Sequence, residues 1–378
     1  MSQLQELIRK LCPNGVEFKE LGKICELSRG KVYSKTYITE NAGKYPVYSS
    51  QTANNGELGL ISTYDYDGEY LTWTTDGAYA GTIFYRKGKF NITNVCGLIA
   101  IKSQDIIIRF LYYWLNANAK GYVYRGMGNP KLMSNQMALI KIPVPPLEVQ
   151  NEIVRILDTF TSHTAELQAE LQAELQARKE QYEYYRNKLL SFDRNNEDIK
   201  WILIKDFTEI GTGSSNTQEE LSVGLYPFFV RSPIVRRKNE YEFDETAIIT
   251  SGDGVGVGKI FHYIEGKYAL HQRAYRIHVC NEKIIPKFLF HYMRCKFYDY
   301  ITRNAYSSSV TSIRKPMLLN FPIPLLSITE QQRIVSILDK FETLVNDLTE
   351  GIPAEIAAVQ EQYEYYRNKL LSFPKLEA

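Results

Sequence analysis

The sequence has no long hydrophobic run and few cysteines, and these two absences narrow the classes of protein that it can encode. No apolar stretch approaches the ~20 residues that a membrane-spanning helix needs. The segment Met1–Lys10 is polar and charged, which is not typical of a secretory signal. The five cysteines are odd in number and no two lie close together in sequence, so we expect no disulfide framework. These features favour the reducing cytoplasm.

The net charge is also small, at +2, but it is distributed unevenly. Residues 1–149 contain 17 basic and 12 acidic residues, and residues 193–329 contain 18 and 15. Residues 150–192 are acidic instead, with 5 basic and 7 acidic residues, as are residues 330–378, with 5 and 9. This partition indicates different partners for the two kinds of segment. A modest basic excess fits a nucleic-acid surface, although alone it is weak evidence.

The strongest signal in the chain is an internal repeat. The thirteen residues EQYEYYRNKLLSF occur at Glu180–Phe192 and again at Glu361–Phe373, an offset of 181. At the same offset, Ile153–Phe160 resembles Ile334–Phe341. Chance does not produce such a match, so the sequence is a duplication. The 378 residues suit two or three domains, which agrees with two copies of one unit.

Each copy is predicted to contain a globular domain followed by a long helix. Short apolar runs bounded by Gly, Asn and Asp, such as Tyr70–Thr74, indicate strands in residues 1–149 and 193–329. Residues 150–192 and 330–378 are predicted to be helical. We therefore expect an α+β fold, in which two β-rich globular domains are separated by two long helices that form an intramolecular antiparallel coiled coil.

The first helical segment contains no Gly or Pro from Gln150 to Ser191 and includes the tract TAELQAELQAEL. Its residues favour helix, and Leu167, Leu171 and Leu175 are predicted to form one row. About 40 residues would give a rod of ~60 Å, whose apolar stripe needs a partner helix. The second segment is the natural partner, although Gly351-Ile352-Pro353 predicts a kink or break in it. The alternative is that each helix packs separately on its own globular domain.

These motifs resemble those of the specificity subunit of type I restriction-modification systems. The resemblance rests on Ile142–Gln150 (IPVPPLEVQ), on the two copies of EQYEYYRNKLLSF and on the TAELQAELQAEL tract. Trp73–Gly97 and Gly266–Ile277 also look like segments of that family's target-recognition domains. The resemblance covers essentially the whole chain, and its helical motifs are more specific than its globular ones.

The resemblance implies a division of labour among subunits. Each globular domain would read one half of a bipartite, asymmetric site in double-stranded DNA, and the helices would set the spacing and dock two methyltransferase (modification) subunits. Restriction subunits would complete the complex. S-adenosylmethionine, ATP and Mg would bind to those partners, while this chain would bind no cofactor and carry no catalytic site.

The motifs that suggest catalysis do not meet the requirements of the chemistry. The glycine-rich run Ser251–Lys259 lacks the spacing of a phosphate-binding loop, and a tight hairpin explains it better. His278, Cys280, His291 and Cys295 lack the close pairs typical of zinc sites. A nuclease would need clustered carboxylates for metal-assisted hydrolysis, and the acidic residues of this sequence are scattered. A self-sufficient DNA methyltransferase or nuclease remains the main alternative, and a coiled-coil scaffold unrelated to DNA is a weaker one. Binding of S-adenosylmethionine by the isolated chain would favour the methyltransferase.

The candidate DNA contacts are basic, amide and hydroxyl residues in predicted loops, because these side chains bind base edges and phosphates. In the first domain they are Lys31, Thr75, Asp76, Tyr79, Arg125, Asn129 and Lys131. In the second they are Arg231, Arg236, Arg237, Lys238, His271, Gln272, Arg273, Ser308, Thr311 and Arg314. The Arg236–Lys238 run is the best phosphate candidate, whereas many of the others could be ordinary solvated side chains.

Tyrosines in the repeated helical run form a second candidate surface. Tyrosine is favoured at protein interfaces, and the same run occurs twice, so both copies would dock the same kind of partner. The alternative is packing inside the coil. The residues proposed for docking are Tyr182, Tyr185, Tyr363 and Tyr366.

Overall fold

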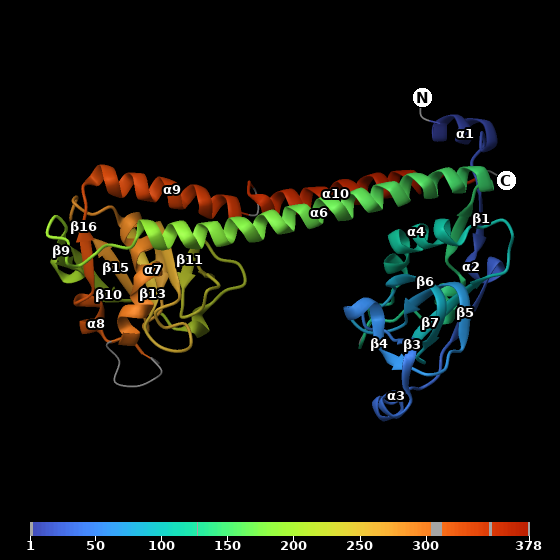
Figure 1. The fold of residues 1–378 in the computed structure, drawn as a ribbon, viewed down its shortest axis with the longest axis horizontal. Coiled ribbons are helices and arrows are strands. Elements are labelled where there is room, and N and C mark those ends of the chain that lie inside the picture. The colour runs from blue at the N-terminus through green and yellow to red at the C-terminus, as the bar shows by residue number, and fades with distance from the viewer. Residues whose placement is uncertain (1–2, 127, 304–311, 348–349, 377–378) are drawn as a thin grey trace. The chain divides into compact units, whose positions relative to one another are not determined.

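The computed structural model describes residues 3–126, 128–303, 312–347 and 350–376. The chain divides into two compact units, which Figure 1 shows as ribbons. Unit 1 comprises Met1–Ala169 and Ala357–Ala378, and unit 2 comprises Glu170–Ile356. Each unit therefore contains one globular part and helical segments from both copies of the repeat. Among the described residues, no helix is long and apolar enough to cross a membrane.

A six-stranded sheet forms the centre of unit 1, in the strand order β2-β7-β5-β6-β3-β4. Neighbouring strands are antiparallel except β3 and β6, which are parallel. A second sheet pairs β1 with β8. The strands are β1 Glu17–Glu20, β2 Cys25–Arg29, β3 Ala42–Tyr48, β4 Glu57–Ile61, β5 Tyr66–Thr74, β6 Ile83–Ile92, β7 Cys96–Ile101 and β8 Lys141–Val144.

Unit 2 has the same sheet topology, in the order β10-β15-β13-β14-β11-β12, again with one parallel pair, β11 and β14. Its two-stranded sheet pairs β9 with β16. The strands are β9 Lys200–Leu203, β10 Thr208–Thr212, β11 Tyr226–Phe229, β12 Arg236–Lys238, β13 Phe243–Ser251, β14 Phe261–Leu270, β15 Ala274–Val279 and β16 Pro322–Leu325. The duplication therefore extends through the globular parts, where the sequences have diverged.

The burial pattern along the central strands follows their sequences. The first half of β5 alternates exposed and half-buried residues, and its last four residues, Leu71–Thr74, are all buried. The first half of β13 is only partly buried, and Ala247–Ser251 are all buried. A strand covered on both faces has no polar alternation. The C-terminal halves of β5 and β13 therefore form the inner part of each core, next to the loops that follow them.

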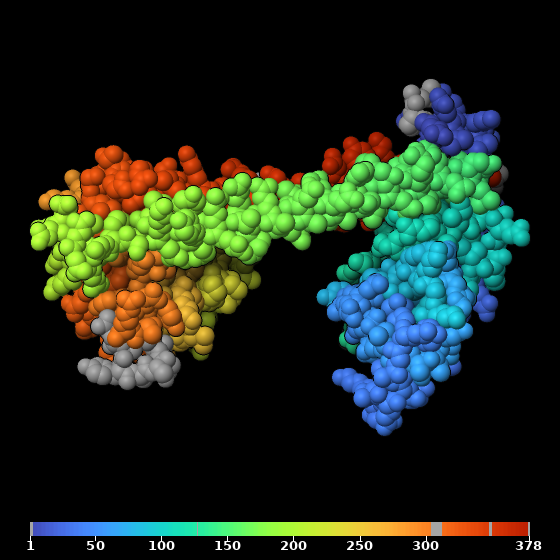
Figure 2. Space-filling view, viewed as in Figure 1, coloured from blue at the N-terminus to red at the C-terminus, as the bar shows by residue number. Residues whose placement is uncertain are grey.

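Each unit also contains short helices. In unit 1 they are α1 Gln3–Leu11, α2 Leu21–Ile24, α3 Lys35–Glu40, α4 Ile108–Asn118 and α5 Ser134–Ala138, with 3-10 turns η1 Ala53–Gly56 and η2 Ala119–Tyr122. In unit 2 they are α7 Pro286–Arg303 and α8 Lys315–Leu319, with η3 Ile204–Asp206 and η4 Thr217–Glu219. In Figure 1, α4 of unit 1 lies next to α6, and the strands extend from α4 towards α3; Figure 2 shows the same face with all atoms drawn.

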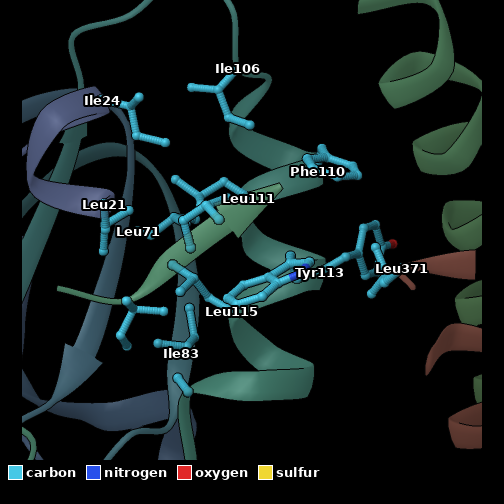
Figure 3. Packing of buried hydrophobic residues seen from close by; sticks show 14 of the residues in the cluster. Leu21, Ile24, Leu71, Ile83, Ile106, Phe110, Leu111, Tyr113, Leu115 and Leu371 are labelled. Carbon is cyan, nitrogen blue, oxygen red and sulfur yellow. The ribbon is translucent and has the colours of Figure 1, made fainter. Parts of the chain in front are cut away.

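The C-terminal segment of the chain completes the core of unit 1. On one side of α4, Leu111 lies near Leu21 and Leu71 (Figure 3). Leu371, from the second copy of the repeat, lies on the other side of α4 (Figure 3). Its repeat counterpart in the first copy, Leu190, is fully buried in the core of unit 2. The two copies thus exchange their helix ends. The core of unit 1 contains the end of the second copy's helix, and the core of unit 2 contains the end of the first copy's helix.

A buried glutamine fixes the start of each long helix. In unit 1, Gln150 Oε1 accepts a hydrogen bond from Ile107 N at 2.8 Å, and Gln150 Nε2 donates to the carbonyls of Asp105 and Pro145, both at 2.7 Å. In unit 2, Gln331 makes the equivalent three bonds, to Ile285 N at 2.8 Å and to the carbonyls of Lys283 and Leu326 at 2.8 and 3.0 Å. Both glutamines are fully buried.

The first long helix is continuous, whereas the second helical segment is two helices. Helix α6 runs from Leu147 to Leu189 over 43 residues. The second segment contains α9, Ile328–Asn346, and α10, Ile352–Leu370. The predicted break is therefore confirmed. A Cβ on Gly351 would lie 2.5 Å from the carbonyl oxygen of Thr343, and Pro353 occupies the first turn of α10, where its missing N–H is tolerated.

The helices pair as predicted. In unit 1, Thr161 of α6 is 2.9 Å from the hydroxyl of Tyr363 in α10, and Gln168 donates to Gln360 at 3.1 Å. Residue numbers rise along α6 as they fall along α10, so the pair is antiparallel. In unit 2, Phe341 of α9 packs against Tyr185 of α6. The alternative, in which each helix packs only on its own domain, is wrong, because α10 of the second copy contacts α6 of the first.

The buried stripe of α6 differs from the predicted leucine row. Between residues 163 and 180 the less exposed side chains are Thr164, Gln168, Leu171, Leu175 and Arg178. Their spacing of four and three residues in turn is that of a coiled-coil seam, whose period is 3.5 residues. Leu167 is 44% exposed. The prediction of one row through Leu167, Leu171 and Leu175 was therefore wrong, because a strict four-residue repeat drifts away from such a seam.

An acidic residue on each long helix anchors the short helix that covers the sheet. In unit 1, Asp158 binds Arg109 and Tyr113 of α4. In unit 2 the corresponding Asp339 is bound by Lys287 at 3.0 Å and His291 at 2.8 Å, both on α7. His291 is fully buried and its Nδ1 has no hydrogen-bond partner among the described residues. Burial lowers the pKa of His291, despite the opposing effect of Asp339.

Replacing His291 with Tyr, the residue that unit 1 has at this position, should reduce the loss of stability in acid. Unfolded histidine takes up a proton as the pH falls through about 6.5, whereas folded His291 does so only at lower pH. The free energy of unfolding of wild type should therefore fall below pH ~6.5, with a contribution of up to ~1.4 kcal/mol per pH unit from this residue. Urea unfolding at pH 7.5 and 5.5 should show a smaller pH effect for His291→Tyr. Equal pH effects in both proteins would contradict this.

Candidate nucleic-acid interface

Five loops of unit 1 are joined by backbone hydrogen bonds into one surface. We call residues 30–32, 49–52, 75–82, 93–95 and 123–133, without residue 127, loop cluster 1. The joining bonds run from Asn94 N to Lys31 O (2.8 Å), from Thr93 N to Tyr48 O (2.8 Å), from Thr75 N to Val95 O (3.3 Å) and from Leu132 N to Thr75 O (2.8 Å). Strands β5 and β6 are joined within this cluster by a turn in which Gly77 has φ +88°, a conformation that favours glycine.

The counterpart loops of unit 2 are joined in the same way. We call residues 213–217, 230–235, 252–258, 271–273 and 312–314 loop cluster 2. The matching bonds run from Gln272 N to Ser215 O (3.0 Å), from His271 N to Phe229 O (2.9 Å), from Gly252 N to Arg273 O (2.9 Å) and from Ile313 N to Gly252 O (2.8 Å). Gly254, the counterpart of Gly77, also has φ +88°. The two clusters therefore share one backbone framework.

The structure brings all the predicted site residues of the first domain together in loop cluster 1. Lys31, Tyr79, Arg125, Asn129 and Lys131 are exposed there, and Asp76 is partly exposed. Lys31 Nζ lies 2.6 Å from Asp65, and this hydrogen bond raises the pKa of Lys31. Thr75 is buried, and its hydroxyl donates to Val95 O at 2.8 Å. Thr75 therefore supports the framework and does not present its side chain to a ligand.

The predicted residues of the second domain divide into several groups. Arg231, Gln272, Arg273 and Arg314 are exposed in loop cluster 2. His271 is only 4% exposed, and burial, followed by the neighbouring Arg231 and Arg273, lowers its pKa. Its neutral ring accepts a hydrogen bond from Arg273 N at 3.0 Å, so His271 supports the loop from inside. Ser308 and Thr311 lie outside the described residues.

The Arg236–Lys238 run lies in β12, outside loop cluster 2, and two of its three cations are engaged. Arg236 binds Glu220 at 2.8 Å, and Lys238 binds Glu219, whose hydrogen bond raises the pKa of Lys238. Arg237 is exposed and has no ion pair within the described part of the chain. Within this run, free positive charge is therefore concentrated at Arg237.

Sequence reasoning missed several polar residues of the clusters. Gln51 and Asn94 lie in loop cluster 1, where Asn94 is exposed. In loop cluster 2, Asn216 Oδ1 accepts a hydrogen bond from Gln272 Nε2 at 2.6 Å. Asp253 also lies in this cluster and binds both Arg231 and Arg273. The amide-rich run Gln51–Asn55 was a usable signal, whereas the ion pairs of Asp253 join residues that are distant in sequence.

The same framework carries different chemistry in the two units. Loop cluster 1 exposes the phenol rings of Tyr79 and Tyr124 beside Arg125 and Lys131. Loop cluster 2 exposes arginines and an amide pair, with Val255 fully exposed at the tip of a turn. Guanidinium, amide, hydroxyl and small apolar groups each prefer different base edges. Each cluster can therefore bind a nucleic acid, with a different base preference.

The repeated tyrosines are placed differently from the docking prediction. Tyr182 is buried, so a partner cannot reach it in this structure. Tyr185 stacks on Phe341, Tyr366 packs against Phe160, and Tyr363 contacts Thr161. The most exposed tyrosines of the run are its two equivalent residues Tyr184 and Tyr365, each 60% exposed. The equivalent residues Tyr185 and Tyr366 are 37% and 40% exposed, so both copies present this second pair to solvent as well.

One group of side chains has the composition of a metal site. It contains His291, Asp339 and Glu342, whose ligand atoms lie within 4.8 Å of one another. Lys287 already binds Asp339 at 3.0 Å, and Arg294 binds Glu342. In unit 1, Tyr113, Arg109 and Asp158 make the equivalent contacts. The group therefore anchors α7 to α9, and its carboxylates are already neutralised.

Comparisons with known proteins agree with this duplicated arrangement. A family model described as the type I restriction modification DNA specificity domain matches residues 13–177 and again residues 196–358. The chain is 33% identical over 367 residues to the Mycoplasma pneumoniae type I specificity subunit S.MpnORF507P, covering 93% of this chain and 96% of that protein. It is 43% identical over 190 residues to the MpnII specificity subunit of the same organism, covering 50% of this chain and 57% of that one.

Solved structures show the same fold. A chain from a study of assembly and conformational transition in a type I R-M system matches with a TM-score of 0.66 and 15% identity, over 95% of this chain and 98% of that one. The HsdS subunit of Thermoanaerobacter tengcongensis matches with a TM-score of 0.55 and 14% identity, over 95% and 97%. At this identity the structural matches bear on the fold alone.

Arg237 gives a test of nucleic-acid contact by β12. Arg237→Ala should weaken binding to all duplexes similarly, and the slope of log affinity against log salt should fall by about one, because one phosphate contact is lost. Arg236→Ala is the matched control, since its guanidinium already binds Glu220. Its salt slope should equal that of wild type. Filter binding between 50 and 200 mM salt measures both, and an unchanged slope in Arg237→Ala would exclude a phosphate contact there.

Proposed function

The chain belongs to the family of type I restriction-modification DNA specificity subunits and has two target-recognition domains, and on this premise we propose that each loop cluster reads one half of a bipartite, asymmetric DNA target. Loop cluster 1 reads one half in double-stranded DNA and loop cluster 2 reads the other. The observation that carries the proposal is the identical backbone framework of the two clusters, combined with their different side chains.

The asymmetry of the target follows from the asymmetry of the reading surfaces. Two clusters with the same side chains would read the same bases twice. Here, Lys31 and Asn94 of cluster 1 occupy the framework positions that Ser215 and Gln272 occupy in cluster 2, as their shared hydrogen bonds define them. Because base preference depends on side-chain donors and acceptors, the two halves of the target differ.

The helices dock the catalytic partners. The thirteen repeated residues present Tyr184 and Tyr365 with equal exposure, which supports two equivalent docking sites for two methyltransferase (modification) subunits. Restriction subunits join through that assembly. In this proposal, S-adenosylmethionine, ATP and Mg bind to the partner subunits, and the specificity subunit itself is non-catalytic. Binding of S-adenosylmethionine to the isolated chain would instead favour a self-sufficient methyltransferase.

The continuous helix α6 sets the spacing between the half-sites. It is the helix that joins one globular part to the next along the chain, and 43 residues span ~64 Å. A deletion of four residues removes ~6 Å and turns the following segment by ~40°, and a deletion of seven removes ~10.5 Å while preserving a 3.5-residue seam. B-form DNA rises ~3.4 Å per base pair. The four-residue deletion should therefore shorten the spacer by about one or two base pairs, and the seven-residue deletion by about three base pairs.

Mapping of methylated sites tests both the bipartite reading and the spacing. Cells carrying the chain with its modification subunits should methylate a site with two different halves. Deletion of Gln168–Leu171, or of Ala165–Leu171, should shorten the unread spacer and leave both half-sites unchanged. A two-residue deletion, which turns the following part of the seam by ~200° and so away from its partner helix, is the control and should abolish methylation. A continuous target in wild type would refute the bipartite reading, and a constant spacer in an active deletion variant would refute the spacing role.

Substitution of the exposed tyrosines tests docking. Tyr184→Ala should leave a complex with one modification subunit, and Tyr184→Ala/Tyr365→Ala should leave none, as measured by native mass spectrometry of the purified complex. Tyr184→Phe keeps the ring and is the matched control. DNA binding by the chain should persist in all three variants, because no cluster residue changes. Two modification subunits bound to the double variant with wild-type affinity would place the docking surface elsewhere.

A further inference from the structure

One carboxylate in loop cluster 2 holds two arginines. Asp253 Oδ1 accepts a hydrogen bond from Arg231 Nη1 at 2.6 Å, and Asp253 Oδ2 accepts one from Arg273 Nη1 at 3.4 Å. The side chain of Asp253 is 29% exposed, whereas those of Arg231 and Arg273 are 41% and 60% exposed. The three side chains together keep a net positive charge, and within the described residues most N–H groups of both guanidinium groups make no other hydrogen bond, so they can bind a ligand.

The backbone fixes the position of this carboxylate. Gly252 N donates to Arg273 O at 2.9 Å, and Gly252 O accepts from Ile313 N at 2.8 Å. A Cβ on Gly252 would lie 2.5 Å from Arg273 O, so the close approach of the two loops requires glycine there. Ser251 Oγ also donates to Asp253 O at 2.8 Å. Asp253 is therefore a fixed point against which two long, flexible side chains are aligned.

Loop cluster 1 keeps the carboxylate but has no arginine at either position. The parallel strand pairs align Tyr48 with Phe229 and Ile92 with Leu270, and the loop bonds align Val95 with Arg273. By the same alignment Ser50 corresponds to Arg231, and Asp76 corresponds to Asp253. Asp76 makes no ion pair within the described residues. The two clusters therefore differ at this point: Asp253 binds two arginines, whereas Asp76 binds none within the described residues.

We propose that Asp253 is a positioning residue that holds Arg231 and Arg273 in place to read guanine, so that the half-site read by unit 2 contains guanine recognised through its major-groove edge. This inference rests on the proposed function. Arginine recognises guanine with two N–H groups directed at O6 and N7, which demands a defined orientation of the guanidinium plane. A carboxylate that binds one edge of each guanidinium supplies that orientation before DNA arrives, so less conformational freedom is lost on binding.

The first experiment locates the guanine. The full chain, purified with its modification subunits, is bound to duplexes that carry the mapped target, with each guanine of the unit 2 half replaced in turn by 7-deazaguanine. This base pairs normally but lacks the N7 acceptor. At least one replacement should weaken binding by about tenfold, within the range expected for loss of an arginine–guanine contact. A half-site without guanine, or one insensitive to every replacement, would overturn the proposal.

The second experiment tests positioning by Asp253. Asp253→Asn has nearly the same shape but no charge, so it should lose most of the preference for G·C over A·T at the sensitive base pair, and 7-deazaguanine should then cause little further loss. The preference at other positions and the thermal unfolding temperature should be unchanged. Asp253→Glu should restore part of the preference. Asp244→Asn, which removes an exposed carboxylate at the other end of β13 and outside both loop clusters, is the matched control and should leave the base preferences of both halves unchanged.

Other outcomes separate this inference from the proposed function. If Asp253→Asn keeps the wild-type base preference while the bipartite target is still read, only the inference fails. If Arg231→Lys and Arg273→Lys weaken binding equally on all sequences, with no change in base preference, the two arginines contact phosphates and the inference again fails. If the wild-type complex does not distinguish its mapped target from other duplexes, the proposed function itself fails.

Discussion

The buried amide at the start of each long helix is the contact on which the rest of the fold depends. Gln150 and Gln331 each make three hydrogen bonds, with the loop before the short helix and with the strand end that precedes the long helix. A fully buried amide that lost these partners would carry a desolvation penalty of roughly 1–3 kcal/mol for each unpaired group. The direction in which each long helix leaves its globular part is therefore fixed by bonds that few other arrangements could satisfy. The proposed spacing role needs this constraint, because a helix that could turn at its first residues would have no defined direction relative to the globular part from which it starts.

The helical half of the fold was readable in the sequence because its determinants are local or repeated. The absence of Gly and Pro in α6, the thirteen-residue repeat and the Gly351–Pro353 interruption each act within a few residues of where they appear. The errors arose where a contact between elements decides the outcome. The buried seam passes through Gln168 and Leu171 but not Leu167, because packing on a neighbouring helix follows a 3.5-residue period. Tyr182 is buried and Tyr184 exposed although both belong to the same motif, because Tyr182 packs into the core of unit 2, near Phe341, and Tyr184 does not.

The candidate site was readable in its location but not in its chemistry. Residue types near predicted turns located most members of both clusters, since loops with Gly, Asp and Asn are where polar side chains project. Charge pairing was not readable. Arg236 and Lys238 looked like free cations, yet Glu220 and Glu219, which lie 16 and 19 residues earlier, bind them. Asp253 looked like part of a hairpin turn, yet it joins Arg231 and Arg273, which lie 22 and 20 residues away on either side of it. Such pairs depend on which strands become neighbours, and the parallel pairing of β11 with β14 has no short-range signal.

The two loop clusters also explain how one scaffold can carry different recognition surfaces. The bonds that join the loops run from backbone N–H to backbone carbonyl, as in Gly252 N to Arg273 O and Thr75 N to Val95 O. Such bonds do not depend on the side chain at either position, so an arginine in one unit can be a valine in the other without loss of the framework. A side chain that cannot change freely is one that the framework itself uses, such as the buried Thr75, whose hydroxyl donates to Val95 O. In these loops the backbone atoms therefore stabilise the fold, and the exposed side chains determine what the surface binds. A change of an exposed side chain can alter base preference while the backbone hydrogen bonds remain.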